Sequence, residues 1–414
     1  MSVEREQPGD AGDLRLRPFG TDTGRLAAKI ALVFLISNLV ATFAKAILAP
    51  EFAGPVPVAI DFHVYWEAAR QAVQGMPLDA FAPVAVPGSE ATGPDGAPSY
   101  LFWVYPPIFL LLLTPLGALP FVPAWALFDA MSLAAVALAL RPFTRTEPAA
   151  WRFMIAAPAL LPALWVGQNS LLFLAGLVGA LACIRDGRMV AAGILIGLLT
   201  FKPQLGILIP VALLAAGLWR TILAACVSAV AVALLPTLVF GFGYWPALSD
   251  TLREFGSVLH AGAAQEPLIC TTFGVLSQLG VNPDAAMAAQ WGVVALAAWA
   301  VWRCWRSPTA SFDLKAATLA AAIPAASPHL WHYDTAFLAA TGLFLLRAGV
   351  LEFRPAGLTV FGLCWLGAGP ALLVVNLLGG VELPVGFLLA PLVLTALGLC
   401  IAAVPRRDAQ ARKA

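Results

Sequence analysis

Charged residues are scarce in this chain of 414 residues: only 11% are Asp, Glu, Lys or Arg, whereas 60% are hydrophobic. Soluble domains carry roughly 25% charged residues, so a soluble globular fold is excluded. The 24 basic and 23 acidic residues leave a net charge of only +1. Because neither sign is in excess, the chain offers no broad electrostatic surface for a nucleic acid or a polyanionic substrate. We therefore expect no nucleic-acid partner.

Cysteine is also sparse. Five of the six cysteines lie within or at the ends of long apolar runs, and only Cys270 lies outside one. This placement supports neither a disulfide framework nor a cysteine metal site. A Rossmann-like glycine motif for binding a nucleotide is missing as well. We expect no cofactor and no resident metal.

The chain contains instead a succession of long apolar runs. The first, residues 30–48, is long enough to span a bilayer and follows a polar, arginine-containing start rather than a cleavable signal. The runs predict an all-α polytopic membrane protein with about twelve transmembrane helices, within a range of about 10 to 13. Membrane lipids are therefore expected partners. The runs cover residues 30–48, 105–140, 151–166, 169–184, 190–201, 204–218, 221–241, 288–302, 312–326, 334–346, 356–378 and 385–404.

The distribution of Lys and Arg residues indicates how these spans are oriented across the membrane. With the N-terminus inside, all but four of the 24 Lys and Arg residues fall on the cytoplasmic side, in line with the positive-inside rule. We expect a multi-pass protein of the plasma membrane with both termini in the cytoplasm. The expected organisation is a tail over 1–25, one integral membrane domain over 26–404 with long outer loops near 49–104 and 242–287, and a tail over 405–414.

Two apolar stretches do not fit a single straight span. Residues 105–140 are too long for one helix, and Pro120 and Pro123 near the middle predict a kink or a broken pair of helices. Residues 190–218 must cross twice in 29 residues. Their helices should therefore be short and buried against neighbouring helices rather than facing lipid.

Polar residues gather at the outer ends of the spans, where binding and catalytic residues usually lie. Asp61 follows a proline-rich entry and is placed to cap a short interfacial helix with an apolar face. The alternative is a general base whose carboxyl pKa is raised by partial burial. Gln168 and Asn169 form a polar break between two spans, which a helix cap explains more simply than a sugar contact.

Two further clusters suggest chemistry. Lys202 lies in an apolar stretch on the outer side, so it either snorkels or holds the phosphate of a lipid carrier. Residues 327–334 place His329, His332 and Tyr333 between two apolar runs. The two histidines would share a face of a helical turn, but a zinc site would need a third ligand, which His63, His260 or Asp334 could supply only by a tertiary approach. Hydrogen bonding of phosphate or sugar by His329 is the simpler interpretation.

Short motifs around these residues occur in a distinctive order: Asp61-Phe-His-Val-Tyr-Trp, Tyr105-Pro-Pro, Gly167-Gln-Asn, Ala191-Ala-Gly-Ile-Leu-Ile-Gly running into Lys202-Pro-Gln, and Ser327-Pro-His with Tyr333-Asp334. Over roughly residues 55 to 345, this order and spacing resemble glycosyltransferase family 87. That family comprises polyprenol-phosphate-mannose-dependent α-1,2-mannosyltransferases with a multi-span GT-C fold.

The resemblance implies a membrane hexosyltransferase of the cell envelope. It would move a hexose, mannose in this family, from a polyprenyl-phosphate donor to a glycolipid or glycan acceptor on the extracytoplasmic face, without a nucleotide. Asp61 would be the catalytic base. Lys202 and His329, and less directly Gln168 and Tyr333, would contact the donor phosphate or the sugar. Residues 82–98 and 242–287 match no part of the family pattern, and we expect them near the acceptor.

The chemistry of such a transfer requires the same kinds of residues. A hydroxyl that displaces a phosphate needs a base near its oxygen and cationic or hydrogen-bond stabilisation of the leaving group. One catalytic carboxylate rather than a pair predicts a single displacement that inverts a β-linked donor to an α-linked product. The alternative is a transporter or flippase of a lipid-linked sugar, with ionisable groups near the bilayer midplane. Asp129 is the main charge inside the apolar runs, so the sequence favours the transferase.

Overall fold

The computed structural model describes the chain except for six short segments, and all structural statements below concern the described part. In that part nearly all regular structure is helical. Strands β1 (Val84–Ala85) and β2 (Tyr100–Leu101) form one short antiparallel pair. The predicted tail over 405–414 lies outside the described residues, as do parts of both predicted outer loops. The described residues are 10–48, 59–85, 100–262, 268–378 and 384–404.

Prolines and 3₁₀ turns divide the helices into long and short pieces. The first half contains α1 (Asp10–Leu14), η1 (Arg17–Gly20), α2 (Asp22–Leu48), α3 (Ile60–Val73), η2 (Pro77–Phe81), α4 (Pro107–Leu113), η4 (Thr114–Ala118), α5 (Phe121–Thr144), α6 (Pro148–Ile155), η5 (Pro158–Leu160), α7 (Leu161–Val166) and α8 (Ser170–Arg185). The second half contains α9 (Met189–Leu198), η6 (Leu199–Phe201), α10 (Pro203–Gly206), α11 (Ile209–Ala215), α12 (Trp219–Phe240), α13 (Tyr244–Gly262), α14 (Thr272–Gln278), α15 (Pro283–Arg306), α16 (Phe312–Ala326), η8 (His332–Ala336), α17 (Phe337–Ala348), α18 (Pro355–Leu366), α19 (Gly369–Leu378) and α20 (Gly386–Ala403).

Six helical segments of the described chain are long and apolar enough to cross a membrane: α2, α5, the α6–α7 segment, α12, α15 and α20. The outermost of them expose apolar side chains along most of their length, as lipid contact requires. An all-α membrane-embedded protein is therefore confirmed. Twelve spans are not confirmed, because several apolar runs form helices shorter than the roughly 20 residues that a bilayer needs.

The predicted break within residues 105–140 is confirmed. The chain forms α4 and η4, then turns at Pro120 before α5 begins. Residues 190–218 also form short helices as predicted, but α9 is not buried on all sides. Its side chains at Val190, Ile194 and Leu198 are exposed on one face, so the expectation that this stretch avoids the lipid-facing surface is wrong for α9.

Helices α9 and α12 pack closely because α9 carries Gly193 and Gly197 four residues apart on one face. A Cβ atom at Gly193 would lie 2.6 Å from the carbonyl oxygen of Thr221, and one at Gly197 would lie 2.8 Å from the backbone nitrogen of Ala229. Small residues at this spacing let two helix backbones approach in a membrane. The glycine pair therefore fixes α9, which leads through η6 directly to Lys202.

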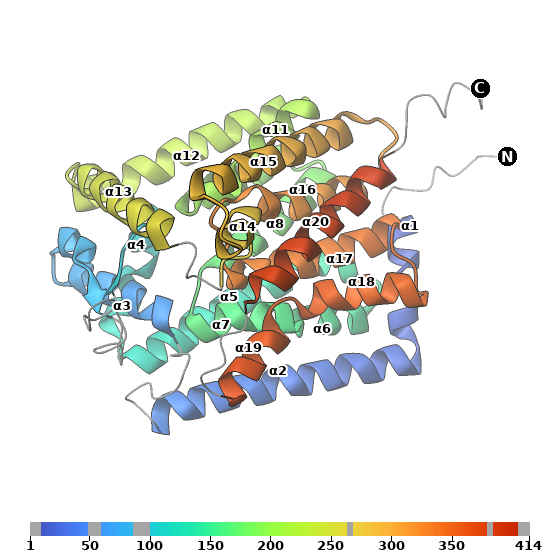
Figure 1. Ribbon diagram of the computed structural model, residues 1–414, viewed down its shortest axis with the longest axis horizontal. Coiled ribbons are helices and arrows are strands. Elements are labelled where there is room, and N and C mark those ends of the chain that lie inside the picture. Colours follow the sequence, from blue (N-terminus) through green and yellow to red (C-terminus); the bar gives the residue numbers. More distant parts are fainter. Residues whose placement is uncertain (1–9, 49–58, 86–99, 263–267, 379–383, 405–414) are drawn as a thin grey trace.

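The helices form a bundle with two distinct ends (Figure 1). Helices α3 and α13 lie at one end, and α1 with the C-terminal end of α20 lies at the other. Helix α5 links the two ends. The Phe121 ring at its start lies 5.8 Å from that of Phe62 in α3, whereas the carbonyl of Phe143 near its end accepts a hydrogen bond from Arg347. The 24 residues of α5 separate these ends by about 35 Å.

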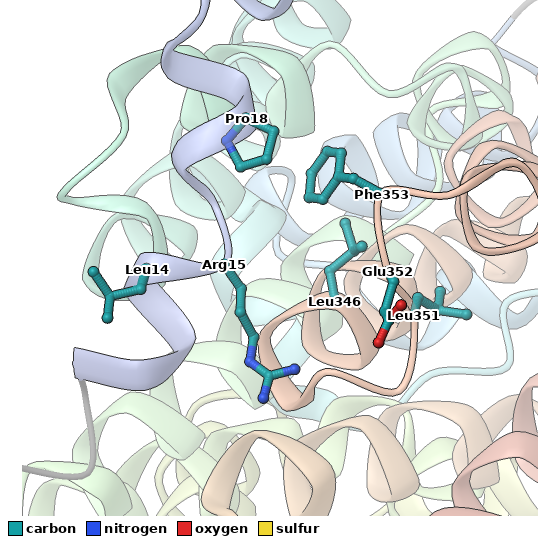
Figure 2. A pocket seen from close by; sticks show the side chains of 7 residues that line it. All are labelled: Leu14, Arg15, Pro18, Leu346, Leu351, Glu352 and Phe353. Atoms are coloured by element: carbon teal, nitrogen blue, oxygen red, sulfur yellow. The ribbon is translucent and has the colours of Figure 1, made fainter.

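A buried charge cluster holds the end of the bundle that contains α1. The guanidinium of Arg347, which is 2% exposed, contacts Asp13 of α1 at 2.6 Å and Asp313 of α16 at 2.9 Å. Beside it lies a cavity of about 240 Å³, in which Arg15 and Glu352 extend from facing segments (Figure 2). Helix α1 therefore packs against α17, and η1 packs against α2 and α6, so both are part of the folded bundle.

The close packing of α9 against α12 predicts that a large side chain at Gly193 destabilises the protein. Gly193→Leu would force α9 away from α12, so we expect a loss of about 1 to 3 kcal/mol of stability or more, seen as a lower apparent Tm of the detergent-purified protein. Gly292→Leu in α15 is the matched control, because a Cβ there meets no atom within 4 Å. Equal Tm values for the two variants would contradict the close approach of α9 and α12.

Candidate active site

Asp61 does not cap α3. The helix begins at Ile60, and the residue at its N-cap is Ala59, with a φ of 57° and no side-chain capping bond. The backbone nitrogen of Ala59 donates to the carbonyl of Trp165 at 2.6 Å, which ties the start of α3 to the end of α7. The capping prediction for Asp61 is therefore wrong. Asp61 lies in the first turn, where its carboxyl interacts with Gln168 and with the charges of Lys202 and Asp334.

Three polar side chains form one part of the site. Tyr65 lies one turn after Asp61 on α3, and its hydroxyl hydrogen-bonds that of Tyr105 at 2.7 Å. Both hydroxyls also reach the amide oxygen of Gln168, which follows the left-handed Gly167 at the end of α7. All three side chains are buried. The Gln168 amide therefore joins α3 to the break between α7 and α8.

A buried ion pair forms the other part. The ammonium nitrogen of Lys202 lies 2.7 Å from Oδ1 of Asp334, and the two residues are 4% and 2% exposed. The Ser170 hydroxyl donates to the same Oδ1 at 2.5 Å and accepts from Lys202 at 3.1 Å. The Lys202 nitrogen also lies 5.3 Å from the ring centre of Tyr333. Lys202 is thus fixed inside the protein, and the snorkelling alternative does not describe it.

The carboxyl of Asp61 has a strongly raised pKa. Burial raises its pKa to about 7 from the usual 3.8, because desolvation penalises the charged form. The positive charge of Lys202 and the hydrogen bond from Gln168 lower this pKa, whereas the negative charge of Asp334 raises it. A carboxyl with a pKa near neutral pH is suited to accept a proton during catalysis.

Asn169 does not cap α8 either. It occupies the N-cap position, but its side chain makes no capping bond. The residue is 0% exposed, and both polar atoms of its amide lack a hydrogen-bond partner within the protein. Buried polar groups are almost always paired, so an orphaned amide beside Gln168 and Ser170 indicates a polar group that a bound molecule would satisfy.

The structure brings together four of the five residues that the sequence singled out: Asp61, Gln168, Lys202 and Tyr333. The ring of His329 lies 5.5 Å from that of Phe273 in α14. Among the described residues, no three His, Cys, Asp or Glu side chains converge as a metal site. The sequence analysis assigned no catalytic or substrate-binding role to five further residues of the site: Tyr65, Tyr105, Asn169, Ser170 and Asp334.

Some of the missed residues carried a signal. Tyr105 and Asp334 both belong to motifs that carry the family resemblance, Tyr-Pro-Pro and Tyr-Asp, but a role was assigned only to Tyr333, the neighbour of Asp334. Tyr65 fits the apolar face of α3 as well as it fits a polar network, so its spacing alone could not reveal the hydroxyl contact.

A comparison with known protein families identifies the family of this chain. The model of glycosyltransferase family 87 matches residues 103–328, more than half of the chain. The chain belongs to glycosyltransferase family 87. It is therefore a glycosyltransferase that uses a sugar donor and an acceptor. No curated protein and no solved structure matches it.

The segment that matches family 87 contains some residues of the site but not others. It includes Tyr105, Gln168 and Lys202, whereas Asp61 precedes it and Asp334 follows it. The resemblance drawn from the motifs is confirmed for the family. The hydrogen bonds and the ion pair then connect the matched segment to the two carboxylates outside it.

Asn169 generates a testable prediction. Replacing it with leucine, which is close to it in size, removes two unpaired polar atoms, so we expect a gain of about 1 to 3 kcal/mol and a higher apparent Tm. Glycosyl transfer should nevertheless fall, because the group that a bound substrate would satisfy is gone. The control is Asn282→Leu, which removes a real cap of α15 and should lower the Tm. Full activity of Asn169→Leu would exclude Asn169 from substrate binding.

Proposed function

We propose that this protein transfers a hexose, mannose by its family resemblance, from a polyprenyl-phosphate donor to a glycolipid or glycan acceptor. Asp61 is the general base, and the transfer inverts the anomeric configuration. The observation that carries the proposal is the meeting of a carboxyl of raised pKa with a buried lysine in a member of a glycosyltransferase family. A GT-C fold is part of this proposal.

The role of Asp61 follows from its surroundings. With a pKa of about 7, a substantial fraction of Asp61 is ionised at neutral pH and still basic enough to take a proton from an acceptor hydroxyl. The hydrogen bond from Gln168 orients the carboxylate, and Tyr65 and Tyr105 hold Gln168 in turn. The acceptor oxygen then forms a bond to the anomeric carbon as the bond to the phosphate oxygen breaks.

Lys202 is the candidate cation for the departing phosphate. Its ammonium group has three N–H donors, of which Asp334 and Ser170 engage two. The third is suited to a phosphate oxygen. Ser170 is the first residue of α8, so the positive end of that helix adds to the same electrostatic effect. His329 and Tyr333 are proposed to contact the sugar or the phosphate.

Two carboxylates in the site raise the question of a retaining mechanism. Asp334 is bound to both Lys202 and Ser170 through one oxygen, so its charge is committed to the ion pair. Asp61 has no such ion pair at hydrogen-bond distance and remains the carboxylate that can act on a substrate. One available carboxylate supports a single displacement with inversion.

The placement of the site supports a transferase over a flippase. The proposed orientation puts the α3 end of the bundle outside the plasma membrane and the Arg347 end, with both tails, in the cytoplasm. Asp61 is on α3, which follows α2 in the chain and is not one of the six helical segments long and apolar enough to cross a membrane. A flippase would need its polar path to continue toward the bilayer midplane.

The role of Asp61 can be tested by its pH dependence. In the parent protein, transfer from polyprenyl-phosphate hexose should rise with pH through about 7 as Asp61 loses its proton. Asp61→Asn keeps the size and polarity but cannot accept a proton, so the rate should fall by a factor on the order of 10² to 10⁴ and lose that rise. A well-folded Asp61→Asn protein with normal activity would remove Asp61 from the mechanism.

Lys202 provides a second variant for the same measurement. Because its charge lowers the pKa of Asp61, Lys202→Met should move the rise in rate to higher pH. If the unpaired Asp334 prevents folding, the double variant Lys202→Met/Asp334→Asn removes both charges of this ion pair. It should shift the profile in the same direction, because Lys202 has the larger effect of the two on that pKa.

The orientation has its own test. In a Cys226→Ser background, Ala85→Cys lies near the α3 end, and Gly187→Cys lies in the turn between α8 and α9. A membrane-impermeant maleimide should label Ala85→Cys in intact cells and Gly187→Cys only after permeabilisation. Labelling of Gly187→Cys in intact cells would overturn the orientation while leaving the chemistry of the site unaffected.

A further inference from the structure

We propose that the cavity between α3 and the η2–β1 segment binds a neutral, polyhydroxylated group, namely a sugar unit of the acceptor other than the one that reacts. This inference rests on the proposed function, since it assumes that the substrate of Asp61 is a glycan. The cavity has a volume of about 380 Å³ and is lined by four polar side chains, His63, Glu67, Gln71 and Asp79. The rest of its lining is alanine, proline and valine.

The walls have the chemistry that carbohydrate binding uses. The carboxylates of Glu67 and Asp79 accept hydrogen bonds from hydroxyl groups, and the amide of Gln71 both donates and accepts. A hydrogen bond of 3.0 Å from Gln71 orients the Glu67 carboxylate. Small apolar side chains complete the lining and can pack against the C–H groups of a sugar ring. The combination suits a polyol better than a purely apolar ligand.

Charge in the cavity selects against an anionic group. Glu67 and Asp79 are both acidic, and neither Lys nor Arg is among the lining residues. The guanidinium of Arg70 contacts Glu67 at 3.3 Å and lies over the Trp66 ring. Burial lowers the pKa of His63, which favours its neutral form. A sugar bearing a phosphate or a carboxylate would therefore meet net negative charge.

The position of the cavity fixes which part of the acceptor it holds. His63, Glu67 and Gln71 recur every four residues and so form one face of α3. Asp61 points from a different face, toward Gln168 and Lys202. Glu67 lies six residues beyond Asp61, about 9 Å along the helix axis. A single sugar at Asp61 cannot also fill the cavity, so an acceptor that occupies both places needs at least a second unit.

Binding of defined sugars tests this inference without requiring transfer. The probes are a neutral manno-trisaccharide, the same trisaccharide with a terminal phosphate, and the monosaccharide, each titrated by calorimetry against the purified protein in detergent. The parent should bind the neutral trisaccharide about tenfold or more tighter than the other two. Equal binding of the phosphorylated trisaccharide would overturn the neutral class, and equal binding of the monosaccharide would overturn the second-unit assignment.

Two variants assign the effect to the cavity. Ala82→Trp fills the cavity from an exposed rim position and should weaken the neutral trisaccharide about tenfold, with the apparent KM for the lipid donor unchanged. Val258→Trp, at an exposed site on α13, is the matched control. The pair Glu67→Gln/Asp79→Asn should narrow the preference for the neutral over the phosphorylated sugar. Unchanged trisaccharide binding by Ala82→Trp would overturn the proposal.

The experiments distinguish a failure of the proposed function from a failure of this inference. If the parent protein binds the trisaccharide but does not consume polyprenyl-phosphate hexose, the donor assignment is wrong and the cavity assignment stands. If the parent transfers sugar to the trisaccharide and to the monosaccharide with equal kcat/KM, the cavity assignment is wrong and the transferase stands.

Discussion

An ammonium and a carboxylate cannot be buried in an apolar helical bundle unless they pair, and in this protein the pair is Lys202 with Asp334. The two residues are 132 positions apart in the chain. Their pairing fixes the break between η6 and α10 against η8, and the hydroxyl of Ser170 adds the start of α8 to the same point. Removing either partner would leave an uncompensated charge, so the three breaks in the helices must stay together.

The pair also sets the electrostatic surroundings of Asp61. Its two charges act on that carboxyl with opposite signs, so they partly cancel, and desolvation is left as the dominant effect on the pKa. A lone lysine would hold Asp61 ionised and weakly basic, whereas a lone carboxylate would keep it protonated. The paired arrangement places the pKa at about 7, where Asp61 is partly ionised yet still a useful base.

The sequence predicted the members of the site better than it predicted their contacts. Lys202 was recognisable because a lysine inside an apolar run has no simple structural role. Asp334 was not chosen as its partner, because neither periodicity nor composition reveals which distant segments meet. The capping predictions for Asp61 and Asn169 failed for a related reason. Cap preferences describe isolated helix ends. In this protein Asp61 interacts instead with Gln168 and Lys202, and the side-chain amide of Asn169 makes no hydrogen bond within the protein.

The fold, like the site, could be predicted from the sequence only in part. Apolar runs reveal where helices occur, so the all-α membrane protein and the break at Pro120 followed from the sequence. Helix length is less visible, because a run of apolar residues looks the same whether it forms one span or two short helices joined by a 3₁₀ turn. Residues 189–215 illustrate this, since they fold as α9, η6, α10 and α11 within one apolar stretch.

These short helices explain why the site lies where it does. Gln168 lies between α7 and α8, Lys202 lies between η6 and α10, and Asp334 belongs to the 3₁₀ turn before α17. Non-helical backbone is tolerated inside a membrane protein only where protein or a polar cavity surrounds it. Each break therefore has to be buried, and burying several at one point concentrates polar backbone and side chains there. The interruptions that make the spans hard to count are the same features that create the site.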